Sequence, residues 1–248
     1  MPSASTISED EIARFNAIAD EWWDPAGKFR PLHQLNPARL EFIRDHLAVH
    51  FGRNSLQDKP LKGLKVIDIG CGGGLLAEPL CRMGADVTGI DAGVEAIRVA
   101  RYHAKEMGLE IDYRQHSPET LADEQGSYDA VLSTEVVEHV ADLDVFLAAS
   151  AKLVRPGGAM VLSTLNRTWK SLAMAKIGAE YVMRWLPVGT HDWGKFRRPS
   201  ELASHIRPYG LEVRALGGMD YNPFDGTWSL SNRLDVNYLM FATRNENA

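Results

Sequence analysis

The pattern of hydrophobic and polar positions divides the chain into a helical first part and an alternating second part. Residues 8–52 carry apolar side chains at helical spacing, for example at Leu40, Ile43 and Leu47. Asn36-Pro37 precedes these positions and is a typical helix start, in which a capping residue is followed by proline. We therefore predict a cap of N-terminal helices that is followed by a polar connector.

After the connector, short apolar runs alternate with longer amphipathic runs, which predicts strands that alternate with helices. The predicted strands are residues 65–69, 86–90, 111–115, 128–133 and 159–164, and the predicted helices are residues 75–83, 95–107 and 142–154. This order is typical of an α/β fold with a mostly parallel sheet and helices on both of its faces. Ligands of such sheets bind beyond the carboxyl ends of the strands.

The last third of the chain departs from this alternation. Residues 165–198 are too long for an ordinary connection, which indicates a lid or an insertion. A helix is predicted from Pro199 to about Tyr209, and closing strands are predicted at 211–216 and 236–243, with a loop at 222–232 between them. We expect a seven-stranded sheet in a single domain, residues 1–248. Its expected parts are the helical cap at 8–52, a ligand-binding core at 64–164, the lid at 165–198, and a helix with closing strands at 199–248.

Composition narrows the possible classes of protein. With 248 residues, of which 45% are hydrophobic, the chain is long enough for one sizeable core. A formal net charge of -6 gives no electrostatic reason to expect nucleic-acid binding. The sequence predicts neither a membrane span nor a secretory signal, because the apolar runs are short and the N-terminus is polar and acidic. Cys71 and Cys81 fit no disulfide framework or zinc pattern, so we expect a cytoplasmic protein.

Residues 68–74 read DIGCGGG and lie where the first predicted strand gives way to a helix. Gly70, Gly72 and Gly74 permit a sharp turn and a close approach of a ligand. The dinucleotide pattern G-x-G-x-x-G would need glycine where Leu75 stands, so that pattern is not met. The turn resembles motif I of class I S-adenosylmethionine-dependent methyltransferases, which implies their Rossmann-like fold and S-adenosyl-L-methionine as cofactor, with S-adenosyl-L-homocysteine as product. A tight turn in some other α/β protein is the alternative.

Polar residues at the ends of the other predicted strands are candidate cofactor contacts. Asp91 follows the second strand, where an acid can accept hydrogen bonds from ribose hydroxyls; its alternative role is to cap the next helix. Asp68 either approaches the cofactor amino group or orders the turn. Ser117 is expected beside the adenine, and Ser133 with Thr134 beside the methionine part. The expected contacts within the core are Asp68, Gly70, Cys71, Gly72, Asp91, Ala92, Ser117, Ser133 and Thr134.

Beyond this turn, the chain resembles the ubiquinone biosynthesis O-methyltransferase family across residues 15–243. The segments that carry the resemblance are FNAIADEWWDPAGKFRPLHQLNPARLEFI (15–43), VIDIGCGGGLLAEPL (66–80), STEVVEHV (133–140), LVRPGG (153–158), STLNRTWKS (163–171), GAEYVMRWLPVGTHDWGKF (178–196) and DVNYL (235–239). The resemblance implies methylation of phenolic hydroxyls on polyprenylated catechol and demethylubiquinol intermediates, at both O-methylation steps of the pathway. Alternatives are a methyltransferase for another small phenolic acceptor and a non-catalytic nucleotide-binding module.

The resemblance also carries over four positions, Arg39, Gly70, Asp91 and residue 134, as cofactor contacts. A guanidinium at Arg39 can grip the cofactor carboxylate with two hydrogen bonds. The alternative is an exposed helix arginine beside an acidic neighbour. Residue 134 is threonine here, where other members can carry methionine, and a contact through the backbone or a side-chain edge would tolerate that difference.

The segment STEVVEHV directly follows the fourth strand, where methyl donor and acceptor must meet. A phenol has a pKa near 10 and needs to lose its proton before it attacks. Two arrangements remain open: His139 accepts the proton while Glu135 or Glu138 orients it, or all three hold Mg²⁺ against the acceptor. Eukaryotic relatives carry a similar E-x-x-E-H pattern and are described as magnesium-binding. The segment can also serve only to shape the loop.

The lid carries a further site candidate and a candidate membrane contact. His191 can reach the acceptor or stabilise the loop. Residues 169–186 combine apolar, aromatic and basic side chains, as in helices that lie in the plane of a membrane surface. Packing over the active site is the alternative. We expect a cytoplasmic protein that is peripheral at the inner face of the membrane, with contacts to membrane lipid and to other ubiquinone-pathway enzymes.

Overall fold

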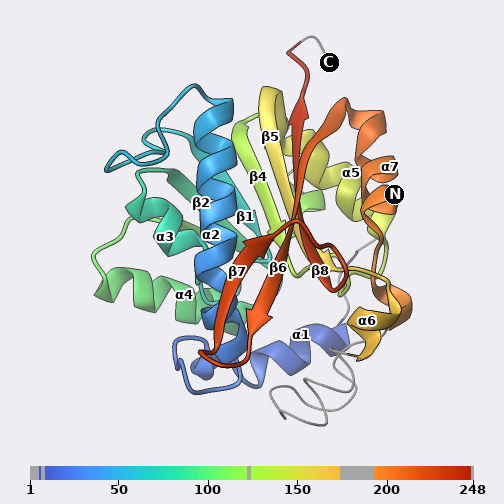
Figure 1. Ribbon diagram of the computed structural model, residues 1–248. Helices are drawn as coiled ribbons and strands as arrows, with labels where there is room; N and C mark the ends of the chain where they lie inside the picture. The colour runs from blue at the N-terminus through green and yellow to red at the C-terminus, as the bar shows by residue number, and fades with distance from the viewer. Residues whose placement is uncertain (1–5, 7–8, 122–123, 174–192, 247–248) are drawn as a thin grey trace.

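The computed structural model describes residues 6, 9–121, 124–173 and 193–246. Its centre is an eight-stranded sheet with the strand order β3-β2-β1-β4-β5-β8-β6-β7 (Figure 1). The strands are β1 Lys65–Ile69, β2 Asp86–Asp91, β3 Asp112–Gln115, β4 Tyr128–Thr134, β5 Val154–Leu165, β6 Leu211–Asn222, β7 Thr227–Ser231 and β8 Asn237–Arg244. Strands β1 to β5 pair in parallel, whereas β8 is antiparallel to both β5 and β6. The predicted α/β fold with a mostly parallel sheet is confirmed.

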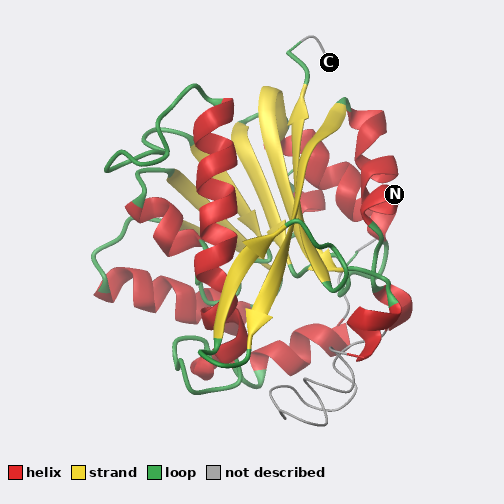
Figure 2. Cartoon of the chain, viewed as in Figure 1, coloured by secondary structure: helices red, strands yellow, loops and turns green. Residues whose placement is uncertain are grey.

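Helices cover both faces of this sheet, as predicted (Figure 2). The helices are α1 Glu9–Asn16, α2 Arg30–His50, α3 Ala77–Arg82, α4 Val94–Glu106, α5 Leu143–Leu153, α6 Trp169–Leu172 and α7 Pro199–Ile206, with short 3-10 helices η1 Ala19–Glu21, η2 Pro118–Thr120, η5 Trp193–Lys195 and η6 Arg207–Tyr209. Helices α2, α3 and α4 pack on one face, and α5 and α7 pack on the other. The strands have apolar residues on both faces, so the sheet is buried on both sides. None of the described helices is long and apolar enough to span a membrane.

Helix α2 begins earlier than the sequence predicted. It starts at Arg30, so Pro31 is the proline at its first turn and Pro37 lies inside the helix. Asn36 is not a cap: it is buried, and its Nδ2 donates to the carbonyl oxygen of Leu75 at 2.6 Å. Proline inside a helix removes one backbone hydrogen bond. The helix continues because its apolar side is held in the core by tertiary packing.

An eighth strand replaces part of the loop predicted at residues 222–232, so the prediction of seven strands was one short. Strand β7 forms a hairpin with β6 and packs against α2. The turn between them is closed by Asn222 Nδ2, which donates to Asp225 Oδ2 at 2.9 Å, and by Gly226 with φ 73°. Large side chains alternate with small ones along β7, and Trp228 and Leu230 join the core. This strand is short and has turn-forming residues on either side, so the sequence predicted a loop here.

The N-terminal part lies across the carboxyl ends of the parallel strands, in the lower part of Figure 1. The carbonyl oxygen of Thr6 accepts from the N–H of Ala141 at 2.9 Å, beyond the end of β4. The side-chain oxygen of Asn16 accepts from the N–H of Glu95 in α4 at 3.3 Å. Helix α1 and the following turns therefore cover the edge at which the ligand is expected.

Candidate functional site

The glycine-rich turn is fixed to the end of β2. Gly70 and Cys71 both donate their N–H to the carbonyl oxygen of Ile90, at 2.8 and 3.0 Å. Gly70, Gly72 and Gly74 have φ values of 74°, 53° and 92°. These left-handed conformations strain any residue with a side chain, so the turn needs glycine at these three positions. The backbone of the turn is thereby presented at the carboxyl end of β1.

Asp91 connects the turn to helix α4. Its Oδ2 accepts from the N–H of Gly72 at 3.0 Å, and its Oδ1 accepts from the N–H of Gly93 at 2.7 Å. Asp91 therefore orders both the turn and the start of α4. Ordering the next helix is the structural role that the sequence offered as the alternative to ribose binding. Each carboxylate oxygen keeps a second lone pair that can accept from a ribose hydroxyl. Burial raises the pKa of Asp91.

Two other predicted contacts lie beside Asp91. Ala92 follows it directly, and its carbonyl oxygen accepts from the Gln115 side chain at 3.3 Å. The N–H of His116 donates to the carbonyl oxygen of Asp91 at 3.1 Å, which brings the end of β3 next to β2. Ser117 comes one residue later and begins the turn into η2. The predicted adenine side thus forms one continuous edge with Asp91.

Three buried polar side chains at this edge each carry an atom without a hydrogen-bond partner among the described residues. Arg39, Asp68 and Ser133 are 4%, 1% and 0% exposed. Arg39 Nε, Asp68 Oδ2 and Ser133 Oγ have no partner among the described residues. Buried polar atoms are rarely left unpaired unless a ligand or water completes their bonding. These atoms fit the amino-acid end of the expected cofactor, because a guanidinium suits a carboxylate and a carboxylate suits an ammonium group.

The charge of Asp68 depends on its surroundings. Burial raises its pKa to about 7, while the nearby Arg39 lowers it and Asp91 raises it further. Asp68 lies on β1 beside Leu132 of β4, one residue before the pairing of Ile69 with Ser133. Strands β1 and β4 therefore bring Asp68 and Ser133 to the same end of the sheet.

Cys71 contributes to the turn through its backbone. Its side chain is buried in the core that contains α3 and α4, and burial raises the pKa of the thiol. The sulfur lies 3.7 Å from the carbonyl oxygen of Gly72. Thr134, the last residue of β4, is half-buried and pairs with Ser163 of β5.

Glu135 joins the predicted cofactor side to the neighbouring strand. Its φ of 56° is in the left-handed region, which is strained for a residue with a side chain. Its N–H donates to the carbonyl oxygen of Ser163 at 2.9 Å, and its Oε1 accepts from Ser163 Oγ at 2.6 Å. The same Oε1 lies 3.3 Å from Arg39 Nη2. Glu135 therefore holds Arg39 and does not face His139.

Glu138 points into the sheet. It is buried, and its Oε2 accepts from Thr164 Oγ1 at 2.9 Å. Burial raises its pKa to about 7. In the sheet, Thr164 pairs with Tyr238 of β8, whose buried hydroxyl has no partner among the described residues. Nothing in the sequence singles out Tyr238, because a lone tyrosine in a closing strand is typical of a core residue.

His139 is oriented by a residue that the sequence analysis missed. Its Nδ1 lies 3.3 Å from Glu11 Oε2 of α1, and its ring contacts the Phe15 ring edge-on. Burial lowers the pKa of His139, but the Glu11 hydrogen bond and the charges of Glu138, Glu11 and Glu135 outweigh it, so the pKa is raised. The sequence predicted Glu135 or Glu138 as the orienting acid, and the structure has Glu11 instead. Only the tertiary fold brings α1 to this position.

The three side chains proposed for Mg²⁺ point to different partners. Glu135 faces Arg39, Glu138 faces Thr164, and His139 faces Glu11. In the described parts of the chain, no three His, Cys, Asp or Glu side chains gather in a way that could hold a metal ion. Magnesium binding at these residues stays a prediction without geometric support. His191 lies outside the described residues.

The two ends of the predicted lid meet. The Trp169 ring stacks on Trp193 with ring centroids 5.5 Å apart, and Trp193 Nε1 donates to the carbonyl oxygen of Thr168 at 3.1 Å. Trp169 is 77% exposed, and Lys170 Nζ lies 3.0 Å from Asp235 Oδ2. The predicted membrane-contact segment beyond Ala173 lies outside the described residues.

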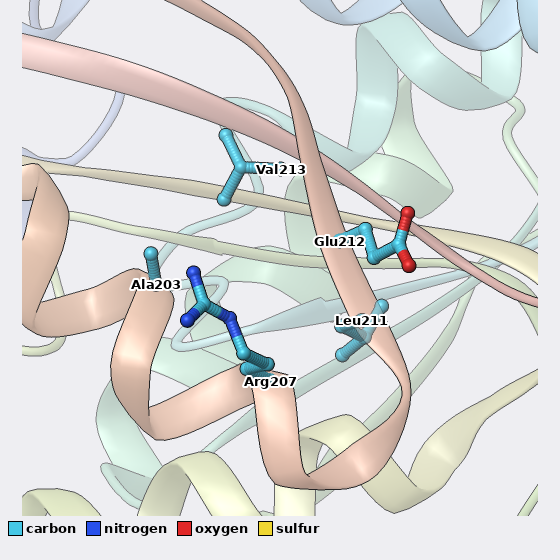
Figure 3. A pocket seen from close by; sticks show the side chains of 5 residues that line it. All are labelled: Ala203, Arg207, Leu211, Glu212 and Val213. Carbon is cyan, nitrogen blue, oxygen red and sulfur yellow. The ribbon is translucent and has the colours of Figure 1, made fainter.

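A separate pocket of about 320 Å³ lies between α7, η6 and β6 (Figure 3). It is lined by Ala203, Arg207, Leu211, Glu212 and Val213. It contains none of the predicted site residues described above, which lie at the carboxyl ends of the strands.

Known proteins resemble this chain closely in sequence and more distantly in structure. Residues 38–216 match a family described as a methyltransferase domain. The chain is 52% identical over 244 residues, covering 98% of each chain, to the ubiquinone biosynthesis O-methyltransferase of Paramagnetospirillum magneticum. It is 53% identical over 245 residues, covering 98% of this chain and 99% of the relative, to the protein of the same name from Cereibacter sphaeroides.

Solved structures of other methyltransferases share the fold. Magnesium protoporphyrin IX methyltransferase from Synechocystis, with bound SAH, matches with a TM-score of 0.64 and 20% identity over 96% of this chain and 95% of that chain. A possible histamine N-methyltransferase from Thermotoga maritima matches with a TM-score of 0.64 and 15% identity over 95% of this chain and 99% of that chain. At such identities these likenesses confirm the fold alone.

Proposed function

This chain belongs to the ubiquinone biosynthesis O-methyltransferase family, and we propose the reaction that its site performs within that family. The protein transfers a methyl group from S-adenosylmethionine to a phenolic hydroxyl of a polyprenylated aromatic intermediate. It acts at both O-methylation steps, on the catechol intermediate and on demethylubiquinol. The observation that carries the proposal is the group of buried, unpartnered polar atoms on Arg39, Asp68 and Ser133 beside the glycine-rich turn.

The chain's own residues account for each part of the cofactor. S-adenosylmethionine supplies an electrophilic methyl group on a sulfonium centre. Arg39 and Asp68 bind its carboxylate and amino groups, and Ser133 completes this end. Asp91 binds the ribose, and the backbone of the turn contributes Gly70, Cys71 and Gly72. Ala92 and Ser117 lie on the adenine side, and Thr134 lies beside the methionine part.

The acceptor side is formed by the segment after β4 and by α1. His139 accepts the phenolic proton, and Glu11 orients the imidazole from the opposite element. Glu138 lies buried beside Thr164, and burial raises its pKa to about 7. Alignment of the phenolic oxygen with the methyl group supplies much of the acceleration of such a displacement. His191 is proposed to reach the acceptor from the lid.

A polyprenylated substrate requires contact with a membrane surface. The exposed Trp169 and the neighbouring Lys170 suit the boundary between lipid head groups and water. We infer that the protein is cytoplasmic and peripheral at the inner face of the membrane, where other ubiquinone-pathway enzymes can pass on the substrate.

Radiolabelled methyl transfer to a short-chain demethylubiquinol tests the proposed function. We expect turnover with S-adenosylmethionine, and we expect it to persist after exhaustive chelation, because the described acidic side chains do not gather around a cation. Loss of turnover on chelation, with recovery on addition of Mg²⁺, would support the metal arrangement instead. Transfer to small phenols but not to the quinol would favour another acceptor.

Ligand-dependent thermal stabilisation separates an enzyme of this kind from a nucleotide-binding module. A ligand that binds only the native state raises the melting temperature. We expect S-adenosylhomocysteine to stabilise the protein and NAD to leave its melting temperature unchanged. Stabilisation by NAD alone would contradict the proposed cofactor.

A further inference from the structure

Two neighbouring tryptophans hold the segment between α1 and α2 on the glycine-rich turn. Trp23 Nε1 donates to the carbonyl oxygen of Gly73 at 2.9 Å, and the Trp23 ring stacks on His103 with ring centroids 3.5 Å apart. Trp22 is only 8% exposed and stacks on Phe29, with ring centroids 3.7 Å apart and 9° between the ring planes. The segment is therefore packed against the turn that we assign to the cofactor.

Position 73 needs glycine because the Trp22 side chain packs against it, and not because of its own backbone conformation. Its φ is outside the left-handed region, unlike those of Gly70, Gly72 and Gly74. A Cβ atom at Gly73 would lie 2.5 Å from both Cβ and Cγ of Trp22, which is closer than such atoms approach. At Gly72, a Cβ atom would lie 2.4 Å from Trp22 Cη2. Two consecutive residues without side chains thus make room for the indole ring.

The polar atom of this ring is left unbonded. Trp22 Nε1 is buried and has no acceptor among the described residues. A buried N–H group rarely stays unpaired in a native protein unless a ligand or water accepts from it. Trp22 lies across Gly72, whose N–H donates to Asp91. The ring that carries the unpaired donor therefore lies on the glycine-rich turn, which follows Asp68 in the chain.

We propose that Trp22 is a cofactor-contacting residue, whose ring covers the glycine-rich turn and whose Nε1–H donates a hydrogen bond to an oxygen of the bound cofactor. This inference rests on the proposed function, because the ligand is the nucleoside that the turn binds. It adds to the site a residue from the N-terminal cap, which the sequence predicted only as helical. Trp23 has a different role. Its indole N–H already donates to Gly73 within the protein, so Trp23 anchors the segment between α1 and α2 to the turn.

Isothermal titration with S-adenosylhomocysteine, together with thermal melting of the ligand-free protein, tests this difference. Trp22→Phe keeps an aromatic ring over the turn but removes the donor. We expect it to weaken S-adenosylhomocysteine binding by about tenfold, as for loss of a hydrogen bond to a polar ligand group. The ligand-free melting temperature should stay the same or rise slightly, because an unpaired buried donor has been removed.

Trp23→Phe is the matched control. It removes a hydrogen bond that the free protein makes, so it should lower the melting temperature of the ligand-free protein. Trp22→Phe with wild-type or tighter affinity would overturn the inference, since the indole N–H would then contribute nothing or the ring would block the site. An equal loss of melting temperature in both variants would also overturn it, because Trp22 would then only anchor the segment. A wild-type protein that does not bind S-adenosylhomocysteine would contradict the proposed function itself.

Discussion

At the scale of single residues, the site consists of polar side chains that the protein itself bonds only in part. Arg39 contacts Glu135 through Nη2, and its Nε remains without a partner among the described residues. Glu135 adopts a left-handed backbone conformation, which costs on the order of 1–3 kcal/mol. Its contacts with Ser163 and Arg39 offset that cost. We infer that Glu135 holds the guanidinium in place before the cofactor binds.

Replacement of Arg39 tests its assignment to the cofactor carboxylate. Arg39→Ala should weaken S-adenosylhomocysteine binding by roughly tenfold to a hundredfold, because hydrogen bonds to a charged group are lost. Isothermal titration measures the change. Arg44→Ala is the control on the same helix, where the guanidinium pairs with Asp45 at the surface. Equal affinity of Arg39→Ala and the wild type would contradict the assignment.

Asp68 should make cofactor binding depend on pH. Burial raises its pKa to about 7 from 3.8, so its carboxyl is charged above pH 7 and becomes protonated below. The neutral form cannot pair with an ammonium group. Affinity for S-adenosylhomocysteine should therefore fall by roughly tenfold from about pH 8 to about pH 6. Titration calorimetry at both pH values measures this difference.

The same titrations on two variants identify the group. Asp68→Asn cannot change its charge and should show weak, pH-independent binding. Asp86→Asn, at the exposed start of β2, should keep the wild-type dependence. If Asp68→Asn kept the full dependence on pH, another group would be responsible.

At the scale of elements, α1 contributes to the proposed acceptor side from a distant part of the chain. Glu11 lies on α1, while His139 follows β4, and the fold brings their side chains to 3.3 Å. Phe15, one turn further along α1, contacts the same imidazole. Helix α1 therefore covers one side of the His139 imidazole, and we infer that its Glu11 carboxylate orients the ring.

Glu11→Gln tests this assignment. The amide can still accept a hydrogen bond but carries no charge, so turnover should fall by about tenfold while S-adenosylhomocysteine affinity stays unchanged. Steady-state methyl transfer together with calorimetry separates the two quantities. Glu41→Gln, an exposed position on α2, should leave both unchanged. Unchanged turnover in Glu11→Gln would show that Glu11 does not orient the base.

Elements with strong periodicity could be predicted from the sequence, and those defined by tertiary contacts could not. Strand β1, the glycine-rich turn and Asp91 follow from local patterns, because apolar runs and glycines report directly on the backbone. Strand β7 is short and lies between turn residues, so only its packing on α2 makes it a strand. The local sequence predicts Asn36 as a helix cap, but its side-chain amide donates to the carbonyl oxygen of Leu75 across the core. Glu11 was missed because an exposed-looking acid in a short helix carries no local signal.

At the scale of the whole molecule, the N-terminal cap and the ends of the predicted lid lie at the same edge of the sheet as the proposed site (Figure 1). The cap contacts the glycine-rich turn, and the lid begins and ends next to Thr168. We expect the apolar tail of a polyprenylated substrate to extend from the proposed site toward the predicted lid. We therefore expect the side of the molecule that carries the ends of the predicted lid to face the membrane.

Vesicle co-sedimentation tests that orientation. Trp169→Ala should lower the bound fraction on anionic vesicles several-fold, because an exposed indole at the membrane interface is lost. Tyr102→Ala, an exposed aromatic on α4, should bind as the wild type does. Equal losses in both variants would argue against a specific membrane-facing side.

The position of β8 between β5 and β6 has a consequence for how the chain is made. The strand that joins the two halves of the sheet, Asn237–Arg244, is synthesised after all the other described strands. Until then, the nascent protein exposes the edge of β5 and the edge of the β6–β7 hairpin, both of which can pair with other chains. A premature stop before residue 237 would leave both edges open in every copy. We expect such a truncated product to aggregate or be degraded, although the codons for its glycine-rich turn and for Asp91 would be intact.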